Sequence, residues 1–126
     1  MSKKIIQTNQ APAAIGPYSQ ANASDSLLFT AGQLPLSPVD GNIVSKSIEE
    51  QTHQVLDNLK AVVEAGGSSL EKVVKTTVFL TDLNNFKTVN DVYAKYFGES
   101  LPARSTIQVA ALPLNSLVEI EAIALK

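Results

Sequence analysis

Residues able to do chemistry gather in two short segments near the C-terminus of this 126-residue chain. The segment PARS (residues 102–105) contains Arg104, and the segment VEIEA (residues 118–122) contains Glu119 and Glu121. A guanidinium is planar and permanently charged, and it binds a carboxylate through two parallel hydrogen bonds. A glutamate beside it can transfer protons or orient a water molecule. Together these residues indicate a pocket for a small carboxylic acid, with hydrolysis or proton transfer next to it.

The same residues also have plainer interpretations. An arginine and a glutamate on neighbouring strands commonly form a cross-strand ion pair without any catalytic role. Glu119 and Glu121 are two residues apart, which in a strand places them about 7 Å apart on one face. That spacing would suit a paired-carboxylate glycosidase site. We disfavour it, because the sequence offers neither a long cleft nor an aromatic platform for a sugar.

Size and composition limit the class of protein. The length of 126 residues, with 44% apolar and 17% charged residues, predicts one folded domain over residues 1–126. No apolar run approaches the roughly 20 residues that cross a bilayer, and the N-terminus lacks the apolar core of a signal peptide. Without cysteine there is no disulfide, thiolate metal site or cysteine nucleophile. We therefore expect a cytoplasmic protein with no membrane partner.

Charge and histidine content narrow the possible partners. The net charge is −2, and Arg104 is the one arginine of the sequence. Nucleic-acid binding depends on lysine and arginine to neutralise phosphates, so it is disfavoured here. His53 is the single histidine, so a histidine metal site or triad would need residues from another chain. We expect no metal, and we expect His53 to be structural, on the exposed side of the first helix.

Strand and turn patterns predict six strands. Residues 9–17 and 34–42 are rich in proline, glycine and other turn formers, and they are expected to be irregular. A hairpin is expected at residues 19–32, across the polar turn 22–26. The β-prone segments are residues 3–7, 19–23, 27–32, 73–80, 104–109 and 117–125.

Two helices are predicted between these strands. Ser47 and Glu50 form a capping-box pattern at the start of the first, and Gly66 and Gly67 end it. The second is expected over residues 85–97. Apolar residues at helical spacing support both helices: Ile48, Val55, Leu59 and Val62 in the first, and Phe86, Val89, Tyr93 and Tyr96 in the second. The order βββαβαββ predicts an α+β fold, a single mixed sheet with both helices on one face.

Such a sheet leaves its second face uncovered. Along residues 73–80, strict alternation places Val74, Val78 and Leu80 on one face and Val73 and Phe79 on the other. The last strand likewise carries apolar residues on both faces, one of them shared with the two glutamates. Exposing that face would leave a large apolar patch, so the pattern predicts an oligomer.

Five segments occur in an order that closely resembles the Rid family, the reactive-intermediate deaminases also known as the YjgF group. The resemblance extends from about residue 3 to residue 125. It implies a chorismate-mutase-like fold that assembles as a homotrimer, with clefts between subunits. The five segments are AAIGPYSQA (13–21), FTAGQ (29–33), VKTTVFL (74–80), PARS (102–105) and VEIEA (118–122).

Carried over residue by residue, the resemblance implies a deaminase that needs no cofactor. Its substrates would be 2-imino acids and their enamine tautomers, such as 2-iminobutyrate and 2-iminopropionate, and its products 2-keto acids and ammonia. Arg104 would bind the substrate carboxylate and Glu119 would act near the reactive carbon. The cleft would be lined further by Tyr18, Ala31, the Gly32 backbone, Asn90 and the backbone at Ile107.

Some of these residues have structural alternatives. Tyr18 would serve as well to stabilise its loop through a hydroxyl bond to the backbone, and Gly32 as a bulge or close-packing point. Asn90, within a helix, would ordinarily face solvent. Two positions depart from the family pattern: Ala31 replaces a common serine, and Ile107 replaces a cysteine three residues after the arginine. They predict retained hydrolysis with an altered substrate preference or a lower rate.

Two functional alternatives remain open. One is a non-catalytic regulatory or interaction protein that binds small carboxylates in the same cleft, since a fold and pocket can outlast a function. The other is the ribonuclease or translation-inhibitor activity attached to parts of the family. The acidic balance and the lone arginine make this second alternative the least favoured.

Overall fold

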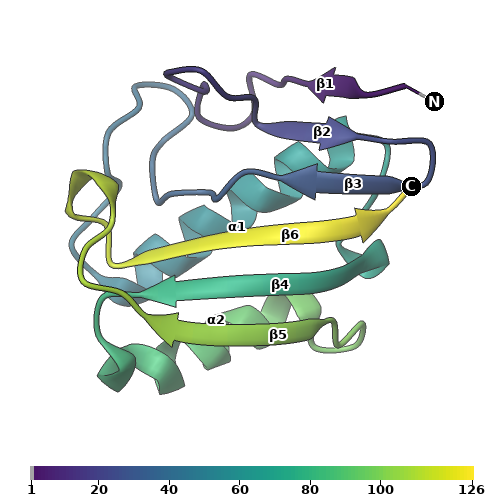
Figure 1. Ribbon diagram of the computed structural model, residues 1–126. Coiled ribbons are helices and arrows are strands. Elements are labelled where there is room, and N and C mark those ends of the chain that lie inside the picture. The colour runs from purple at the N-terminus through teal and green to yellow at the C-terminus, as the bar shows by residue number, and fades with distance from the viewer. Residues whose placement is uncertain (1) are drawn as a thin grey trace.

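The computed structural model describes residues 2–126, which form six strands and two main helices in the predicted order βββαβαββ (Figure 1). Short 3₁₀ turns precede β4 and α2 and connect β5 to β6. The elements are β1 (Lys4–Ile6), β2 (Ala21–Ala23), β3 (Leu27–Thr30), α1 (Ile48–Ala65), β4 (Val73–Leu80), α2 (Phe86–Phe97), β5 (Ala103–Gln108) and β6 (Val118–Leu125).

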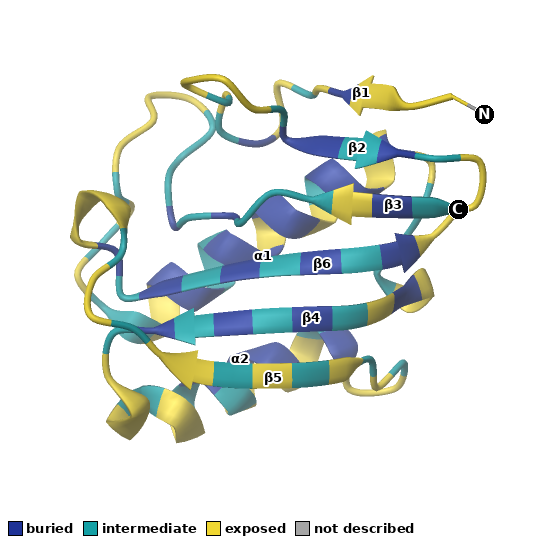
Figure 2. Cartoon of the chain, in the orientation of Figure 1, coloured by how far each residue is buried: buried dark blue, intermediate teal, exposed yellow. Residues whose placement is uncertain are grey.

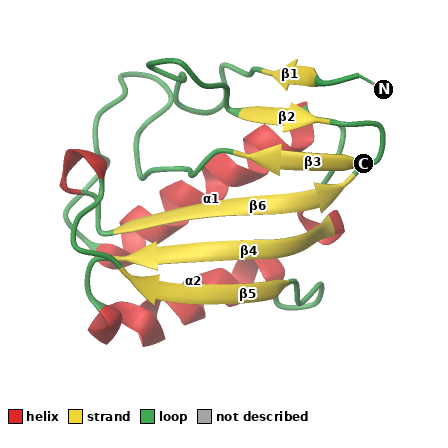
Figure 3. Cartoon of the chain, viewed as in Figure 1, coloured by secondary structure: helices red, strands yellow, loops and turns green. Residues whose placement is uncertain are grey.

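All six strands belong to one mixed sheet in the order β1-β2-β3-β6-β4-β5. Neighbours are antiparallel except β4 and β5, which are parallel. A parallel pair needs a long crossover, and α2 supplies it. Both helices cover the same face of the sheet (Figure 3). The predicted α+β architecture is therefore confirmed.

The N-terminus of α1 is capped by Ser47, whose Oγ accepts a hydrogen bond of 3.3 Å from the backbone N–H of Glu50. The second hydrogen bond of a capping box would run from the N–H of Ser47 to the side chain of Glu50. Here the N–H of Ser47 donates instead to Ser45 Oγ, at 2.8 Å. At the other end, Gly67 adopts a φ of +84°, the left-handed conformation that favours glycine. The predicted boundaries of α1 are thus confirmed.

The core lies between the helix-covered face of the sheet and the two helices (Figure 2). On β6 the predicted alternation is confirmed, since Val118, Ile120, Ala122 and Ala124 are buried and the residues between them are not. The largest fully buried side chains include Phe97, Leu28, Leu56, Leu59, Leu80 and Ile120.

The predicted alternation at the start of β4 is wrong. A register shift between Val73 and Lys75 marks a β-bulge, which adds one residue to this strand. The bulge places Val73 on the buried face together with Val78, whereas Val74 is 42% exposed. A bulge resets the faces without any signal in the apolar pattern.

The second face of the sheet has no helix over it. Phe29 on β3 and Ile107 on β5 are 44% and 46% exposed, and Phe79 and Ile123 lie between them on this face in partly exposed positions. We refer to this surface as the open face. Its apolar character agrees with the sequence pattern from which we predicted an oligomer. The oligomer itself remains a prediction.

The expected position of His53 on the exposed side of α1 is wrong. The side chain is partly buried and turns toward α2, where Nδ1 lies 3.2 Å from the hydroxyl of Tyr96. That hydroxyl donates to Asp57 Oδ1 at 2.7 Å. Burial and the neighbouring Asp57 raise the pKa of Tyr96, so the phenol remains protonated. These contacts connect the two helices, consistent with the structural role expected for His53.

Candidate functional site

The sequence-derived site residues fall into two groups on opposite faces of the sheet. Glu119 belongs to the first group, on the open face, and Arg104 to the second, on the face toward α2. We call them the Glu119 half-site and the Arg104 half-site. The first comprises Gly32 and Glu119 together with Ala31 and Tyr18 of the adjoining cleft, whose lining does not include Gly32 or Glu119. The second comprises Asn90, Arg104 and the free edge of β5.

The Glu119 half-site depends on a close approach between β6 and the segment that follows β3. Gln33 and Ile120 exchange backbone hydrogen bonds of 2.8 and 3.2 Å, which hold Gly32 beside Glu119. A Cβ atom added to Gly32 would lie 2.7 Å from the carboxyl carbon of Glu119. Position 32 therefore has to lack a side chain if this carboxylate is to stay where it is. Gly32 is the close-packing point that the sequence analysis gave as its structural alternative.

The surroundings of Glu119 disfavour its ionised form. Its partial burial, together with the negative charge of nearby Glu121, raises its pKa. Both causes penalise the ionised form, because burial removes water and a like charge repels. A carboxylate whose pKa lies nearer neutrality accepts a proton more effectively.

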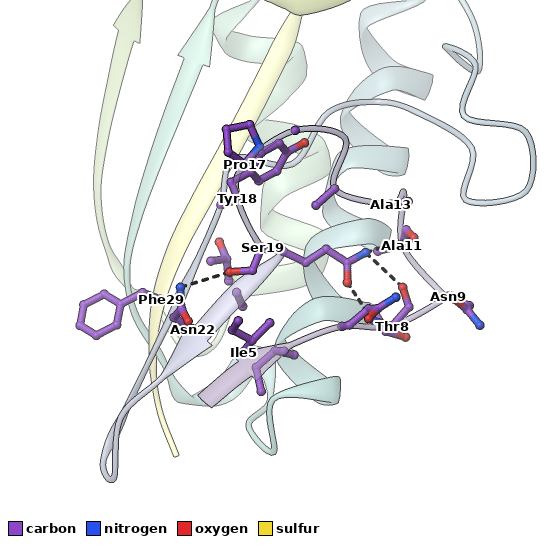
Figure 4. Close-up of a pocket in the computed structure, with 18 of the residues that line it drawn as sticks. Ile5, Thr8, Asn9, Ala11, Ala13, Pro17, Tyr18, Ser19, Asn22 and Phe29 are labelled. Atoms are coloured by element: carbon purple, nitrogen blue, oxygen red, sulfur yellow. Dashed lines mark hydrogen bonds between the residues drawn. The ribbon is translucent and has the colours of Figure 1, made fainter. Parts of the chain in front are cut away.

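Tyr18 and Ala31 line a cleft with a volume of about 1070 Å³ (Figure 4). The cleft is formed by β1, β2, the irregular segment between them and the end of β3. That segment is held by Gln20, whose amide nitrogen donates to the carbonyls of Thr8 and Pro12 at 3.1 and 2.8 Å. The backbone carbonyl of Gln20 also accepts a hydrogen bond from the N–H of Ala31. This bond attaches the segment directly to the end of β3.

Tyr18 lies at one end of this cleft, beside Pro17 (Figure 4). Its side chain is 57% exposed, and its hydroxyl forms no hydrogen bond within residues 2–126. Within a single chain the backbone-bonded alternative for Tyr18 is therefore wrong. Asn22 also lines the cleft, where its side-chain amide donates to Ser19 Oγ at 3.1 Å, while its buried side-chain oxygen Oδ1 has no hydrogen-bond partner in the described residues.

The Arg104 half-site lies where the edge strand β5 passes α2. Arg104 pairs in register with Thr76 of β4, whose side chain is fully buried under the helices, so Arg104 also faces the helical layer. Its guanidinium carbon lies 4.8 Å from the ring centre of Tyr93 and 5.5 Å from that of Phe86. Asn90 lies on the same side of α2, four residues after Phe86 and three before Tyr93.

No carboxylate of the described chain pairs with Arg104. The one ion pair within residues 2–126 joins Lys87 and Asp91 on the surface of α2. The alternative in which Arg104 and Glu119 form a cross-strand ion pair is therefore wrong for a single chain. The guanidinium keeps its hydrogen-bond donors available for a ligand.

The two half-sites of one chain do not meet. Phe79 of β4 pairs with Glu119 of β6 on one side and with Ile107 of β5 on the other. Ile107 is therefore the residue of β5 level with Glu119, and Arg104 lies three residues before it. Two strand spacings and three residues along a strand correspond to roughly 14 Å between the Cα atoms of Arg104 and Glu119. Their side chains also point to opposite faces.

The structure places the side chain of Ile107 on the open face. Its neighbour Thr106, which was not predicted from the sequence, belongs to the Arg104 half-site instead. Side chains alternate along a strand, so Thr106 shares the face of Arg104 and Ile107 does not. The N–H of Val109 donates to Leu80 of β4, so by alternation the N–H of Ile107 also points toward β4. The N–H of Thr106 then points outward from the free edge, beside Arg104. The strand period alone would have indicated Thr106.

Neither a metal-binding cluster nor a membrane-spanning helix was found in the described residues. Residues 2–126 contain no group of three or more histidine, cysteine, aspartate or glutamate side chains placed to hold a metal ion. Within the same residues, neither helix combines the length and apolar character needed to span a bilayer.

The structure is a small α+β domain. It has a mixed sheet with helices on one face, an arginine without an acidic partner on its edge strand, and a partly buried glutamate on its open face. Comparison with known proteins identifies its class. The family described as Endoribonuclease L-PSP matches residues 8–126. The chain belongs to this family, which is the Rid or YjgF group.

Relatives of known name support the assignment. Reactive Intermediate Deaminase A, chloroplastic, from Arabidopsis thaliana is 54% identical over 98% of this chain and 66% of that protein. The mouse 2-iminobutanoate/2-iminopropanoate deaminase is 51% identical over 98% of this chain and 92% of that protein. A Lactococcus lactis protein whose name proposes a regulatory role, AldR, is 49% identical over 96% of both chains.

Solved structures agree with the fold. YyfA of Yersinia pestis, described as a Rid family protein of unknown function, superposes with a TM-score of 0.96 at 50% identity, covering 99% of this chain and 100% of that chain. TdcF of Escherichia coli, crystallised with bound serine, gives a TM-score of 0.93 at 47% identity over 98% of both chains.

Proposed function

We propose that this protein hydrolyses 2-imino acids and their enamine tautomers to 2-keto acids and ammonia, at sites completed between copies of the chain. The observation that carries the proposal is the pair of half-sites. Arg104 is a carboxylate receptor without an acidic partner, and Glu119 is a carboxylate with a raised pKa, yet one chain holds them on opposite faces. The name and 51% identity of the mouse relative supply the substrate class.

The reaction needs few groups from the protein. Water adds to the imine carbon and gives a tetrahedral carbinolamine, which expels ammonia and leaves the keto acid. Arg104 binds the substrate carboxylate through two hydrogen bonds and so fixes the orientation of the imine. The outward N–H of Thr106 offers a further donor to the same anion. Glu119 takes a proton from the attacking water and returns it to the leaving nitrogen.

A homotrimer would bring the two half-sites together. The free edge of β5 and the open face are the two surfaces of the chain that a second copy has to meet, because they carry Arg104 and Glu119 respectively. Covering the open face also removes Phe29, Phe79 and Ile107 from water. The number three rests on the family resemblance and is part of the proposal.

A second candidate function is the binding of small carboxylates by a regulatory protein. The name of AldR and the serine bound to TdcF support it, since both relatives are close to half identical to this chain. Arg104 serves either function, but only hydrolysis requires the basicity of Glu119. We do not propose the ribonuclease activity in the family's description, because a net charge of −2 with a single arginine suits phosphate binding poorly.

An imine-trapping assay tests the proposal. An amino-acid oxidase generates 2-iminobutyrate in the presence of semicarbazide, which traps free imine, and the parent protein should divert it to the keto acid. Arg104→Ala and Glu119→Gln should each abolish that diversion, whereas Lys87→Ala, which removes an exposed charge from α2, should not. A parent protein that leaves all short imino acids to the trap would contradict hydrolysis. Binding of 2-oxobutyrate without turnover would favour the regulatory alternative.

A further inference from the structure

The guanidinium of Arg104 is held by aromatic rings where an acidic partner would be usual. Phe86 and Tyr93 are seven residues apart on α2, two turns along one side of the helix, and both rings contact the same cation. The edge strand β5 supplies Arg104, and β4 supplies the residue that fixes one of the rings. Three elements thus cooperate in placing one side chain.

Tyr93 is the fixed part of this arrangement. It is 8% exposed, its hydroxyl lies 2.7 Å from Thr76 Oγ1, and its ring packs at 4.7 Å from that of Phe97. Thr76 is also the register partner of Arg104 across β4 and β5. The ring is therefore anchored to the same strand pair that carries the arginine.

Phe86 is the outer ring of the pair. As the first residue of α2 it is 39% exposed, so burial in the core does not account for its position. Its ring centre lies 5.5 Å from the guanidinium carbon, within the range of a cation–π interaction. Removing this ring leaves the inner ring and the helix in place, which makes Phe86 the suitable residue for a test.

Aromatic rings differ from an acidic partner because they carry no carboxylate oxygens. A cation–π contact therefore does not tie up the five N–H groups of the guanidinium in bidentate hydrogen bonds. A carboxylate partner would use those same N–H groups and compete with a carboxylate ligand. A long arginine side chain otherwise loses rotamer freedom when it binds, so fixing it beforehand favours binding.

We propose that Phe86 and Tyr93 are positioning residues that orient the Arg104 guanidinium for a carboxylate ligand while leaving its hydrogen-bond donors free. The inference rests on the proposed function in one respect, that Arg104 is the carboxylate anchor. It adds two residues that do not touch the reacting atoms and act through Arg104.

The test uses the fact that Arg104 is the one arginine of the chain, so its Nε–Hε group gives a single, assigned NMR signal. Nitrogen relaxation of that signal reports how restricted the side chain is in the ligand-free protein. In the parent we expect a restricted group, and in Phe86→Leu a mobile one with an order parameter below about 0.6. Phe86→Tyr, which restores a ring, should recover the parental value.

Kinetics and binding provide the second readout. In Phe86→Leu we expect KM for imino acids, and the dissociation constant of 2-oxobutyrate, to rise about 2- to 5-fold, the size of one cation–π contact at a partly exposed site. The value of kcat should change less, because Glu119 is untouched, and Phe86→Tyr should recover KM. The thermal unfolding midpoints of the variants serve as the control for folding.

The outcomes separate this inference from the proposed function. If the parent hydrolyses no imine but Arg104 loses order in Phe86→Leu, the proposed function fails and the positioning role stands. If the parent is active and Phe86→Leu keeps both parental order and parental KM, the positioning role is overturned. A folded Phe86→Leu protein with a mobile Arg104 but unchanged ligand affinity also overturns it.

Discussion

Substitution of Gly32 by alanine should inactivate the protein without unfolding it. A Cβ at position 32 would lie 2.7 Å from the carboxyl carbon of Glu119, where ordinary contact distances are 3.4–4 Å. The nearer carboxylate oxygen would be closer still. The Glu119 carboxyl group therefore has to retreat by more than about 1 Å, and a displacement of about 1 Å already costs about 100-fold when it misplaces a catalytic group.

Stability should change little, for two reasons. The backbone of Gly32 lies outside the left-handed region that favours glycine, so alanine fits its conformation. The group that has to move is the end of a flexible side chain rather than a packed strand. We expect a thermal unfolding midpoint close to that of the parent, with kcat for 2-iminobutyrate lowered about 100-fold.

A double-mutant cycle identifies the cause. In a Glu119→Ala background there is no carboxylate to displace, so adding Gly32→Ala should have no further effect on stability or on the residual rate. Parental kcat in the single Gly32→Ala variant would refute the reasoning. Equal loss of activity from Gly32→Ala in both backgrounds would show that alanine acts on something other than Glu119.

Three further predictions concern the same groups. Burial and Glu121 raise the pKa of Glu119, so activity that needs the ionised base should fall as the pH drops through that raised pKa. In Glu121→Gln the like charge is gone, and the acid limb of the kcat/KM profile should move to lower pH. An unmoved limb would contradict the assignment of Glu119 as the base. Arg104→Lys should raise KM for imino acids at least tenfold, since an ammonium cannot bind a carboxylate in the bidentate manner, and parental KM would count against the anchor. Thr106→Val should change KM ratios between short and bulky imino acids more than Ile107→Val does, because Thr106 shares the face of Arg104; the reverse order would support the family-based placement of Ile107.

The order of elements was predictable because each depends on local signals. Ser47 begins α1 through a side-chain cap, Gly67 ends it through its backbone conformation, and β6 alternates strictly along its length. At the start of β4 the same rule failed, because a bulge at Val74 shifts the faces and the run of apolar residues hides it.

The residues of the candidate site were proposed from the family resemblance, which did not predict their arrangement. Contact between Gly32 and Glu119 arises from a bridge between segments far apart in the chain, so no local pattern carries it. The placement of Arg104 against α2 follows from strand register, which sequence does not specify. Thr106 is the exception, since strand alternation would have placed it beside Arg104.

Subunit complementation tests the central claim, that one chain supplies Arg104 and another supplies Glu119. Arg104→Ala and Glu119→Gln chains, each inactive alone, would be co-expressed in equal amounts and assayed for 2-iminobutyrate hydrolysis together with the size of the assembly. Random mixing in a ring of copies gives about one quarter of the sites both parental groups, so we expect about a quarter of parental activity. Mixed assemblies that form but remain inactive would contradict a site shared between copies.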